Sequence, residues 1–323
     1  MSPVRPKIAL LGAGRFANAL LAVLAPSAPA LTAWARRPAA RRALQKAHPW
    51  ISLAESPAEA CDDAELVIFA IPASGLREVA SAYGAVARGD QLVVHGTRGV
   101  EPGFRLPHQI LREETCVRFI AALGGPLHLP DLALGRPVSL VAGCRFDHVI
   151  DRLSAFTTGT PARVHGSRDL VGVEVAGAVS NASLIAGGIA AALELGETAK
   201  GLLLTRGLDE ARRLGVALGA TAETFNGLAG VGDLIPREVT SARRHHRLAK
   251  ALAAGTPAKD ALAGIKGDIE GVEVARSAAA LGATLDLELP LLGALASILS
   301  GEVGAAEAID GLLRLDLNLG APA

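Results

Sequence analysis

Short apolar runs recur through the first half of the chain, each bounded by glycine, proline or polar residues. They lie within residues 7–11, 30–37, 64–72, 90–97, 117–125, 138–143 and 162–167, and helical stretches such as 74–87 separate some of them. Because apolar strands that alternate with helices are typical of a parallel sheet covered on both faces, we predict such a sheet here.

The pattern changes after Asp169, a residue type suited to capping a helix start. Apolar positions then follow helical spacing, and the runs stop at glycines. Those runs are 170–195, 197–214 in two pieces, 249–255, 270–282 and 290–301. No strand-like alternation appears in this half, so we predict an α/β domain over residues 1–168 and an all-α domain over residues 169–323.

The run from Leu170 to Leu193 is about long enough to cross a bilayer, because roughly 20 apolar residues suffice. It contains Glu174 and Asn181, however, and no other segment resembles it. We therefore predict a core helix and no membrane span. The N-terminal sequence leads directly into a strand pattern without a signal peptide, which favours a cytoplasmic protein.

Composition narrows the class of partner. Aromatic residues make up only 3% of the chain, so Ala, Leu, Val and Ile must build the core. Lys plus Arg and Asp plus Glu balance at 32 each, and no basic stripe indicates a nucleic-acid surface. Cys61, Cys116 and Cys144 are too widely spaced for a disulfide framework or a metal motif, so no metal site is expected.

The strongest motif follows the first apolar run. Residues 12–17 read G-x-G-x-x-A, in which Gly12 suits a tight turn, Gly14 the approach of a pyrophosphate, and Ala17 the packing of helix on strand. The free amide groups at the start of the following helix favour an anion. This strand–turn–helix context predicts a dinucleotide site and a Rossmann-type, doubly wound N-terminal sheet.

The end of the second strand indicates which dinucleotide binds. NAD sites usually carry an acidic residue there, whereas an arginine suits the 2′-phosphate of NADP. This chain has Arg36 and Arg37 and no Asp or Glu in that turn, which favours NADP and leaves NAD open. The alternative for one of the pair is an ordinary solvated surface arginine.

With these elements placed, the sequence resembles the bacterial type of NAD(P)-dependent glycerol-3-phosphate dehydrogenase over nearly its whole length. The matching segments include GAGRFANALL, VIFAIPASGLREV, GTRGVEPG, ETFNGLAGVGDL and EGVEVARSAAALG, and above all the stretch from Gly172 to Asp233. The resemblance implies a Rossmann domain followed by a helical substrate domain, with the active site between them. It also implies hydride transfer between a nicotinamide and the carbon of dihydroxyacetone phosphate or glycerol 3-phosphate.

The resemblance also carries over individual residues. For the cofactor it implies Gly12, Gly14, Arg15, Phe16, Ala17, Arg36, Arg37, Arg98, Arg244 and Glu270. For the substrate, Gly125, Asn181, Asp233 and Arg244 match the family pattern, and we add Arg98 and Arg243 as predicted substrate residues. The planar guanidinium of Arg244 suits a phosphate group.

Several positions depart from the family pattern. Arg98 stands where the family has lysine, Leu127 where it has serine, and Arg243-Arg244-His245 where it reads Ser-Arg-Asn. The largest departure is Ser180, which replaces the catalytic lysine. That lysine moves the proton on the substrate oxygen, and loss of such a general acid or base alone costs ~10²–10⁴ in rate.

A serine hydroxyl needs an adjacent base for that task, and the guanidinium of Arg98 stays protonated. His245, His246 or His128 could supply the proton, because histidine titrates in the right range, although histidines are more often structural or exposed. The catalytic group is therefore predicted as Ser180, Asn181, Asp233 and His245.

The helix spacing leaves two interpretations of Ser180 and Asn181. Residues 174, 177, 181, 184 and 188 would share one helix face, and Ser180 would lie about 100° round from Asn181. Without the resemblance, both would be read as small polar residues satisfied by hydrogen bonds to neighbouring helices. The resemblance instead places both in the cleft, with Ser180 lacking the acid/base role.

Three functions remain open. The first is an active NAD(P)-dependent oxidoreductase whose small anionic hydroxy or oxo substrate is not, or not only, glycerol 3-phosphate. The second is an inactive NADP(H)-binding sensor, a pseudoenzyme that acts on a protein partner. The third is an ordinary glycerol-3-phosphate dehydrogenase with another proton donor. A homodimer is the assembly considered, with neither a nucleic-acid nor a membrane partner.

Overall fold

The structure is a computed structural model that describes residues 7–24, 30–240 and 243–316. The chain forms two compact units. Unit 1 comprises residues 1–98 and 105–174, and unit 2 comprises residues 99–104 and 175–323. The chain therefore passes between the units after Arg98, after Phe104 and after Glu174.

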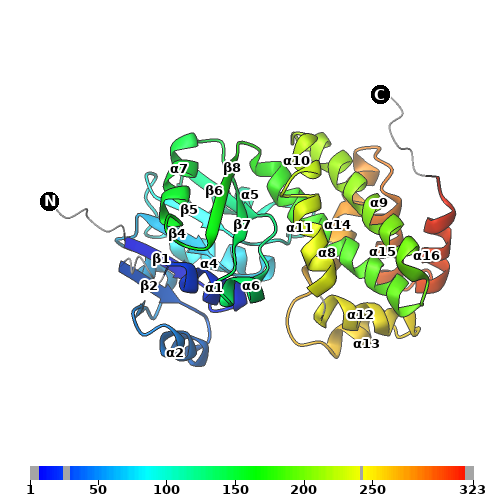
Figure 1. The fold of residues 1–323 in the computed structure, drawn as a ribbon, viewed down its shortest axis with the longest axis horizontal. Coiled ribbons are helices and arrows are strands. Elements are labelled where there is room, and N and C mark those ends of the chain that lie inside the picture. The colour runs from blue at the N-terminus through cyan, green and yellow to red at the C-terminus, as the bar shows by residue number, and fades with distance from the viewer. Residues whose placement is uncertain (1–6, 25–29, 241–242, 317–323) are drawn as a thin grey trace. The chain divides into compact units, whose positions relative to one another are not determined.

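Unit 1 is built on one eight-stranded sheet with the order β3-β2-β1-β4-β5-β6-β7-β8 (Figure 1). The strands are β1 (Lys7–Leu11), β2 (Ala30–Trp34), β3 (Ser52–Leu53), β4 (Leu66–Phe69), β5 (Leu92–His95), β6 (Phe119–Gly124), β7 (Val138–Gly143) and β8 (Ala162–Ser167). Strands β1 to β6 are parallel, β7 is antiparallel to β6, and β8 is parallel to β7. The doubly wound sheet is confirmed. The prediction of a parallel sheet is wrong for β7 and β8, because an apolar run does not encode strand direction.

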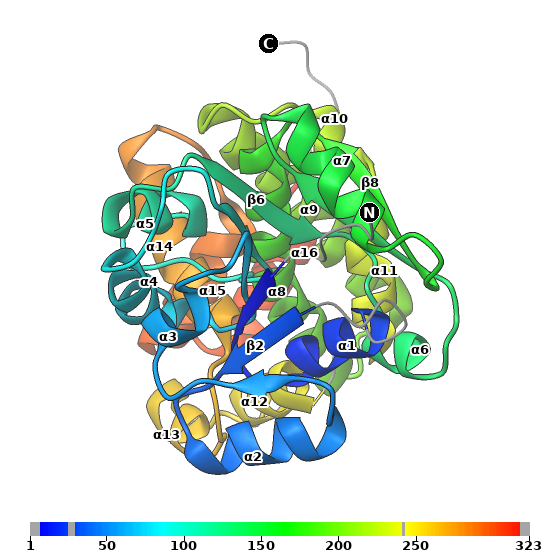
Figure 2. The same cartoon turned by 90° about the vertical axis from the view of Figure 1, so that its left-hand side faces the viewer.

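Helices cover both faces of this sheet, because successive side chains of a strand point to opposite sides. In β1, Ile8 and Leu10 belong to the core under α1, α2 and α7, whereas Ala9 and Leu11 belong to the core under α3, α4 and α5. Figure 2 shows α3, α4 and α5 on one side of the sheet and α1 on the other. These helices are α1 (Arg15–Leu24), α2 (Pro38–Ala47), α3 (Pro57–Cys61), α4 (Leu76–Gly84), α5 (Pro107–Glu114) and α7 (Asp147–Phe156), joined by the short η2 (Ala73–Gly75) and α6 (Leu129–Ala133).

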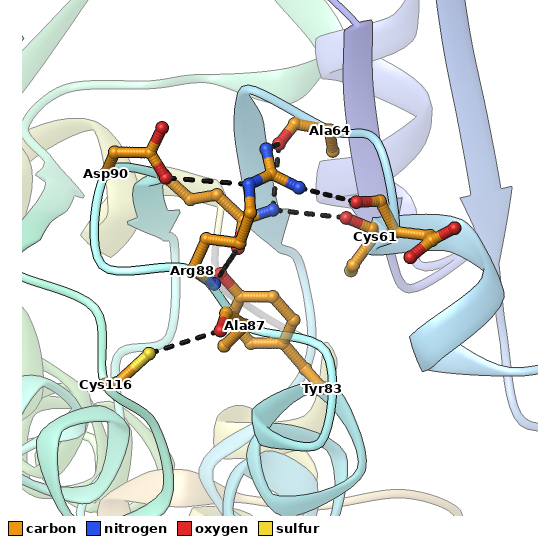
Figure 3. Close-up of polar contacts among 9 residues, drawn as sticks. Cys61, Ala64, Tyr83, Ala87, Arg88, Asp90 and Cys116 are labelled. Atoms are coloured by element: carbon orange, nitrogen blue, oxygen red, sulfur yellow. Dashed lines mark hydrogen bonds and ion pairs between the residues drawn. The ribbon is translucent and has the colours of Figure 1, made fainter.

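A polar network fixes the connection between α4 and β5 (Figure 3). The Gln91 amide is 1% exposed and donates to the main-chain oxygens of Cys61 at 3.1 Å and Ala64 at 2.8 Å. Its oxygen accepts the Tyr83 hydroxyl and the backbone N–H of Arg88, both at 2.8 Å. Every polar position of this buried amide is thus used. Burial raises the pKa of Tyr83, and it raises the pKa of Cys61 to about 12, so both groups stay neutral and structural.

In its described residues, unit 2 contains helices and no strand, which confirms the all-α prediction for the C-terminal half. The helices are α8 (Leu170–Ala192), α9 (Gly196–Ala217), α10 (Glu223–Asn226), α11 (Val231–Thr240), α12 (Arg243–Ala253), α13 (Ala258–Ala263), α14 (Glu270–Thr284), α15 (Pro290–Ser300) and α16 (Ala305–Arg314). The predicted break within residues 197–214 is wrong, since α9 is continuous. Tertiary packing of Gly207 and Gly215 overrides the low helix propensity of glycine.

Small residues bring α8 close to its neighbours in unit 2. A Cβ added to Gly207 of α9 would clash with Ser183, and one added to Gly271 of α14 would lie 2.5 Å from the main-chain oxygen of Asn181. Likewise, a Cβ at Gly188 would lie 2.8 Å from Ala249 of α12. By length and composition α8 could cross a membrane, but 83% of its most apolar window is buried within the protein. That burial supports the predicted core helix.

Buried charges on α9 hold the ends of two other helices. Glu210 accepts the backbone N–H groups of Leu291 at 2.6 Å and Leu292 at 2.9 Å, in the first turn of α15. Arg206 donates to the main-chain oxygen of Leu315 at 2.8 Å, just after α16. A carboxylate at a helix start and a guanidinium at a helix end both match the helix dipole.

Candidate dinucleotide and substrate site

The glycine turn between β1 and α1 has the geometry of an anion site. Gly12 has a φ of 128°, and a Cβ there would clash with the main-chain oxygen of Ala70, so only glycine fits. Gly14 is exposed, and a Cβ on it would meet no atom within 4 Å, so its backbone borders open space. Helix α1 begins at the exposed Arg15, and Ala17 is fully buried against the sheet. The turn therefore leaves room for a phosphate group beside the amide groups that start α1.

Phe16 connects this turn to the end of β5. A Cβ added to Gly96, the residue after β5, would clash with the Phe16 ring, so the ring and the strand end are in close contact. Two residues later the chain reaches Arg98, which is half-buried.

The two arginines after β2 are both exposed, but their surroundings differ. The Arg36 guanidinium lies 2.7 Å from the carboxylate of Glu78 in α4, and it also passes close to Gly75. Arg37 lies at the start of α2. Glu78 was not among the predicted site residues, because an acidic residue in the helix that follows β4 carries no signal of its partner in the sequence. A bound 2′-phosphate would compete with this carboxylate for Arg36.

Arg98 and Gly125, two predicted substrate residues of unit 1, lie together. The Arg98 guanidinium donates to the main-chain oxygen of Gly125 at 3.2 Å. Gly125 follows β6 with a φ of 85°, and its oxygen also accepts the Leu127 N–H at 2.7 Å. The Leu127 side chain packs on an apolar cluster that includes Ala19 of α1.

In unit 2, Ser180 of α8 and Asp233 of α11 form a buried pair. Their residues are 7% and 1% exposed, and the neighbouring Asn181 is 3% exposed. The Ser180 hydroxyl lies 3.1 Å from the main-chain oxygen of Gly177 and 3.4 Å from the Asp233 carboxylate. Because a hydroxyl has one proton, it donates to one of these acceptors at a time. Ser180 thus has a carboxylate beside it, as a serine that acts on a substrate proton requires.

The remaining residues of unit 2 gather around α12 and the start of α14. Arg244 is exposed, its guanidinium lies against Gly267, and it donates to the main-chain oxygen of Asp268 at 3.2 Å. This places Arg244 beside the segment that leads into Glu270, the first residue of α14. His245 is half-buried and His246 exposed, while the predicted Arg243 side chain lies outside the described residues.

His128, the third histidine considered as a proton source, is held in unit 1 by a carboxylate. Its Nδ1 lies 2.7 Å from Asp131, which also accepts a hydrogen bond from Arg136 at 2.9 Å. These hydrogen bonds from His128 and Arg136 lower the pKa of Asp131.

Glu174, which helix spacing grouped with Asn181, lies buried in unit 1 between two histidines. Oε1 lies 2.9 Å from Nε2 of His95, and Oε2 lies 2.5 Å from Nδ1 of His108. Burial by itself would raise the pKa of Glu174, but the contacts with His108 and His95 outweigh it and lower that pKa to about 2. The sequence signal was a single acidic residue in an apolar helix, with no indication of its partners.

Together these features define a class of protein. The sheet order, the glycine turn that opens α1, the arginines after β2 and the all-helical second half are typical of nicotinamide-dinucleotide-dependent oxidoreductases with a Rossmann domain.

The chain belongs to the NAD-dependent glycerol-3-phosphate dehydrogenase family. The family's N-terminal domain matches residues 7–149, and its C-terminal domain matches residues 169–310. The enzyme named glycerol-3-phosphate dehydrogenase (NAD(P)+) of Cupriavidus necator is 35% identical, covering 96% of this chain and 98% of its own. That of Thiobacillus denitrificans is 36% identical, covering 97% and 99%.

A solved structure agrees with this assignment. Glycerol-3-phosphate dehydrogenase from Coxiella burnetii superposes with a TM-score of 0.88 at 27% identity, covering 97% of this chain and all of that one. The predicted family, the fold and the NAD(P) class of cofactor are thereby confirmed.

Proposed function

We propose that the protein is an NADP-preferring oxidoreductase that transfers hydride between the nicotinamide and a small anionic hydroxy or oxo substrate. Residues 1–168 would bind the dinucleotide and residues 169–323 would supply most of the substrate site. The observation that carries the proposal is the open turn at Gly14 together with the exposed Arg36 after β2. We expect the protein in the cytoplasm, with a homodimer as the first assembly to test.

The residues of unit 1 fit the dinucleotide. Gly12 and Gly14 would hold the pyrophosphate against the start of α1, with Arg15 and Phe16 beside it. Arg36 and Arg37 would hold the 2′-phosphate, because two guanidinium groups pair well with a phosphate dianion. When bound, NADP(H) supplies the group that accepts or gives the hydride.

The substrate set combines cations with the polar pair of α8 and α11. Arg98, Arg243 and Arg244 would favour an anionic substrate, and Gly125 would border it. Arg244 and Glu270 would also contact the cofactor. Asn181 would hydrogen-bond the substrate, and Ser180 would turn its hydroxyl proton from Gly177 to the substrate oxygen. In reduction, Ser180 would pass this proton to the substrate oxygen while taking one from the protonated carboxyl of Asp233, 3.4 Å away. In oxidation the proton would run the opposite way, from the substrate hydroxyl through Ser180 to the Asp233 carboxylate.

The second candidate is a dinucleotide-binding sensor without turnover, acting on a protein partner. It is favoured by Ser180, whose hydroxyl is bonded within its own helix at 3.1 Å and lacks an amine to titrate. The third candidate is an ordinary glycerol-3-phosphate dehydrogenase, in which His245, His246 or His128 would be the proton donor.

Calorimetry with NADPH and NADH, followed by NADPH oxidation assays, separates these functions. We expect NADPH to bind more tightly than NADH, and the protein to turn over at least one phosphorylated ketone or 2-oxo acid. A normal enzymatic rate with dihydroxyacetone phosphate would refute both divergent candidates. Tight NADPH binding without turnover of any compound would support the sensor, and absence of dinucleotide binding would refute the proposed site.

A further inference from the structure

The buried carboxylate of Glu174 lies where the chain passes between its two units. The three crossings follow Arg98, Phe104 and Glu174 itself. His95 ends β5 shortly before the first crossing, and His108 lies in the first turn of α5 shortly after the second. Both histidines contact Glu174, so this carboxylate lies next to the chain near each of the three points where it passes between the units.

Three groups of unit 1 hold this carboxylate, which is 4% exposed as a residue. Oε1 accepts the backbone N–H of His108 at 2.8 Å and lies 2.9 Å from Nε2 of His95. Oε2 lies 2.5 Å from Nδ1 of His108. Nε2 of His95 faces Oε1 at short range, although neither ring nitrogen of His95 makes an aligned hydrogen bond to a described residue.

The contact with His108 also ties Glu174 to a helix start. The His108 N–H is one of the amide groups at the beginning of α5 that have no partner inside that helix. A carboxylate there satisfies the amide and meets the positive end of the helix dipole. Glu174 thus joins the first turns of α8 to the start of α5 and the end of β5.

We propose that Glu174 is a positioning residue for the reaction, whose carboxylate fixes the start of α8 against the ends of β5 and α5. The inference rests on the proposed function, in which Ser180 and Asn181 of α8 and Arg98 after β5 meet the substrate. Because α8 is one continuous helix over Leu170–Ala192, a displacement at Glu174 moves Ser180, nearly two turns further along. The segment 96–106 between β5 and α5 is held at both ends by the same carboxylate.

A positioning role separates the rate from cofactor affinity. The hydrogen bonds and ion pairs of Glu174 among the described residues are with His95 and His108 and not with the glycine turn, so loss of its charge should leave NADPH binding nearly unchanged. A displacement of about 1 Å in groups that meet the substrate lowers the rate on the order of 100-fold. We therefore expect Glu174→Gln to lower kcat by roughly 10–100-fold with little change in the Kd for NADPH.

The experiment compares Glu174→Gln with a matched control, Glu210→Gln. Glu210 is also a buried carboxylate that accepts backbone N–H groups at a helix start, but it lies wholly within unit 2 and is no proposed site residue. The milder His95→Asn serves if Glu174→Gln does not fold. For each protein we would measure Tm, the Kd for NADPH and amide hydrogen exchange, and also kcat and KM with the phosphorylated ketone or 2-oxo acid that the wild-type protein turns over. Glu210→Gln should have a lower Tm and an unchanged kcat.

The outcomes distinguish this inference from the proposed function. A kcat equally unchanged in Glu174→Gln and Glu210→Gln overturns the positioning role while the function stands. If the wild-type protein does not bind NADPH, the proposed function fails. Hydrogen exchange needs no ligand, so it still tests whether Glu174 holds α8, β5 and α5 together. If Glu174 holds these elements in place, residues 96–106 and residues 175–187 should both exchange faster in Glu174→Gln than in Glu210→Gln. Exchange equal to that of Glu210→Gln in either segment overturns the inference.

Discussion

Replacing Ser180 with lysine tests the prediction that the lack of an amine at this position limits the reaction rate. The position is 7% exposed and has the Asp233 carboxylate beside it, 3.4 Å from the present hydroxyl. An ammonium about 4 Å from that carboxylate gains ~4 kcal/mol of Coulomb energy at an effective dielectric near 20. This gain offsets a burial penalty of several kcal/mol, so we expect Ser180→Lys to fold with a modest loss of Tm.

The expected gain in activity is that of a restored general acid. Such a group contributes ~10²–10⁴ in rate, equivalent to about 3–5 kcal/mol of barrier. The assay is NADPH oxidation with dihydroxyacetone phosphate, after calorimetry has shown unchanged NADPH binding. Ser180→Met is the matched control, because it has similar length and no amine.

Two results would refute the prediction that the lack of an amine at residue 180 limits the rate. If Ser180→Lys folds and binds NADPH but turns over no faster than Ser180→Met, the missing amine does not limit the site, and other departures such as Leu127 and His245 do. If the wild-type protein already reacts at a normal enzymatic rate, another group supplies the proton and Ser180 marks no loss.

Three further predictions concern charge. Arg36→Ala should weaken NADPH binding by roughly tenfold or more and leave NADH binding unchanged in calorimetry, with the exposed Arg42→Ala as control; equal losses for both dinucleotides would contradict a 2′-phosphate contact. Burial raises the pKa of Glu210 from 4.5 to about 7, so its ~3 kcal/mol of stability is present below pH 4.5 and lost as the pH rises through 7. In denaturant unfolding, the free energy of unfolding of Glu210→Gln should not fall between pH 4.5 and pH 7 as that of the wild-type protein does. The same fall in both proteins would contradict this assignment. Glu174 should give the opposite pH dependence of the free energy of unfolding, because its pKa is lowered from 4.5 to about 2. Its stabilisation is present above pH 4.5 and is lost as the pH falls towards 2, and the unfolding of Glu174→Gln should lack this acid sensitivity.

Local features of the fold could be predicted because each is encoded in adjacent residues. The G-x-G-x-x-A turn, the arginines after β2 and the helical spacing after Asp169 all lie within a few residues of one another, and the structure contains each element. Strand direction and the unbroken α9 could not be predicted in this way. Both depend on partners distant in sequence, such as Phe225 against Gly215.

The same distinction applies to the charged groups. The sequence identifies Arg36 as a cation after β2, but its partner Glu78 is 42 residues away. Helix spacing groups Glu174 with Asn181, but it does not reveal the contact of Glu174 with His108, 66 residues away in the sequence. Helix periodicity specifies which side chains share a direction, but it does not specify which unit meets each part of a helix that belongs to both.

If Ser180 stands in place of a catalytic lysine, as the resemblance implies, the packing around it bears on whether the site has decayed or uses another proton route. A site in decay would tolerate loosened packing and solvent around its former catalytic group. Here Ser180 and Asp233 stay buried, and their side chains lie within hydrogen-bonding reach of each other. A buried carboxylate costs free energy unless a polar partner faces it, and the Ser180 hydroxyl is such a partner. The hydroxyl–carboxylate pair is therefore a built feature of unit 2, and it favours an altered proton route over simple loss.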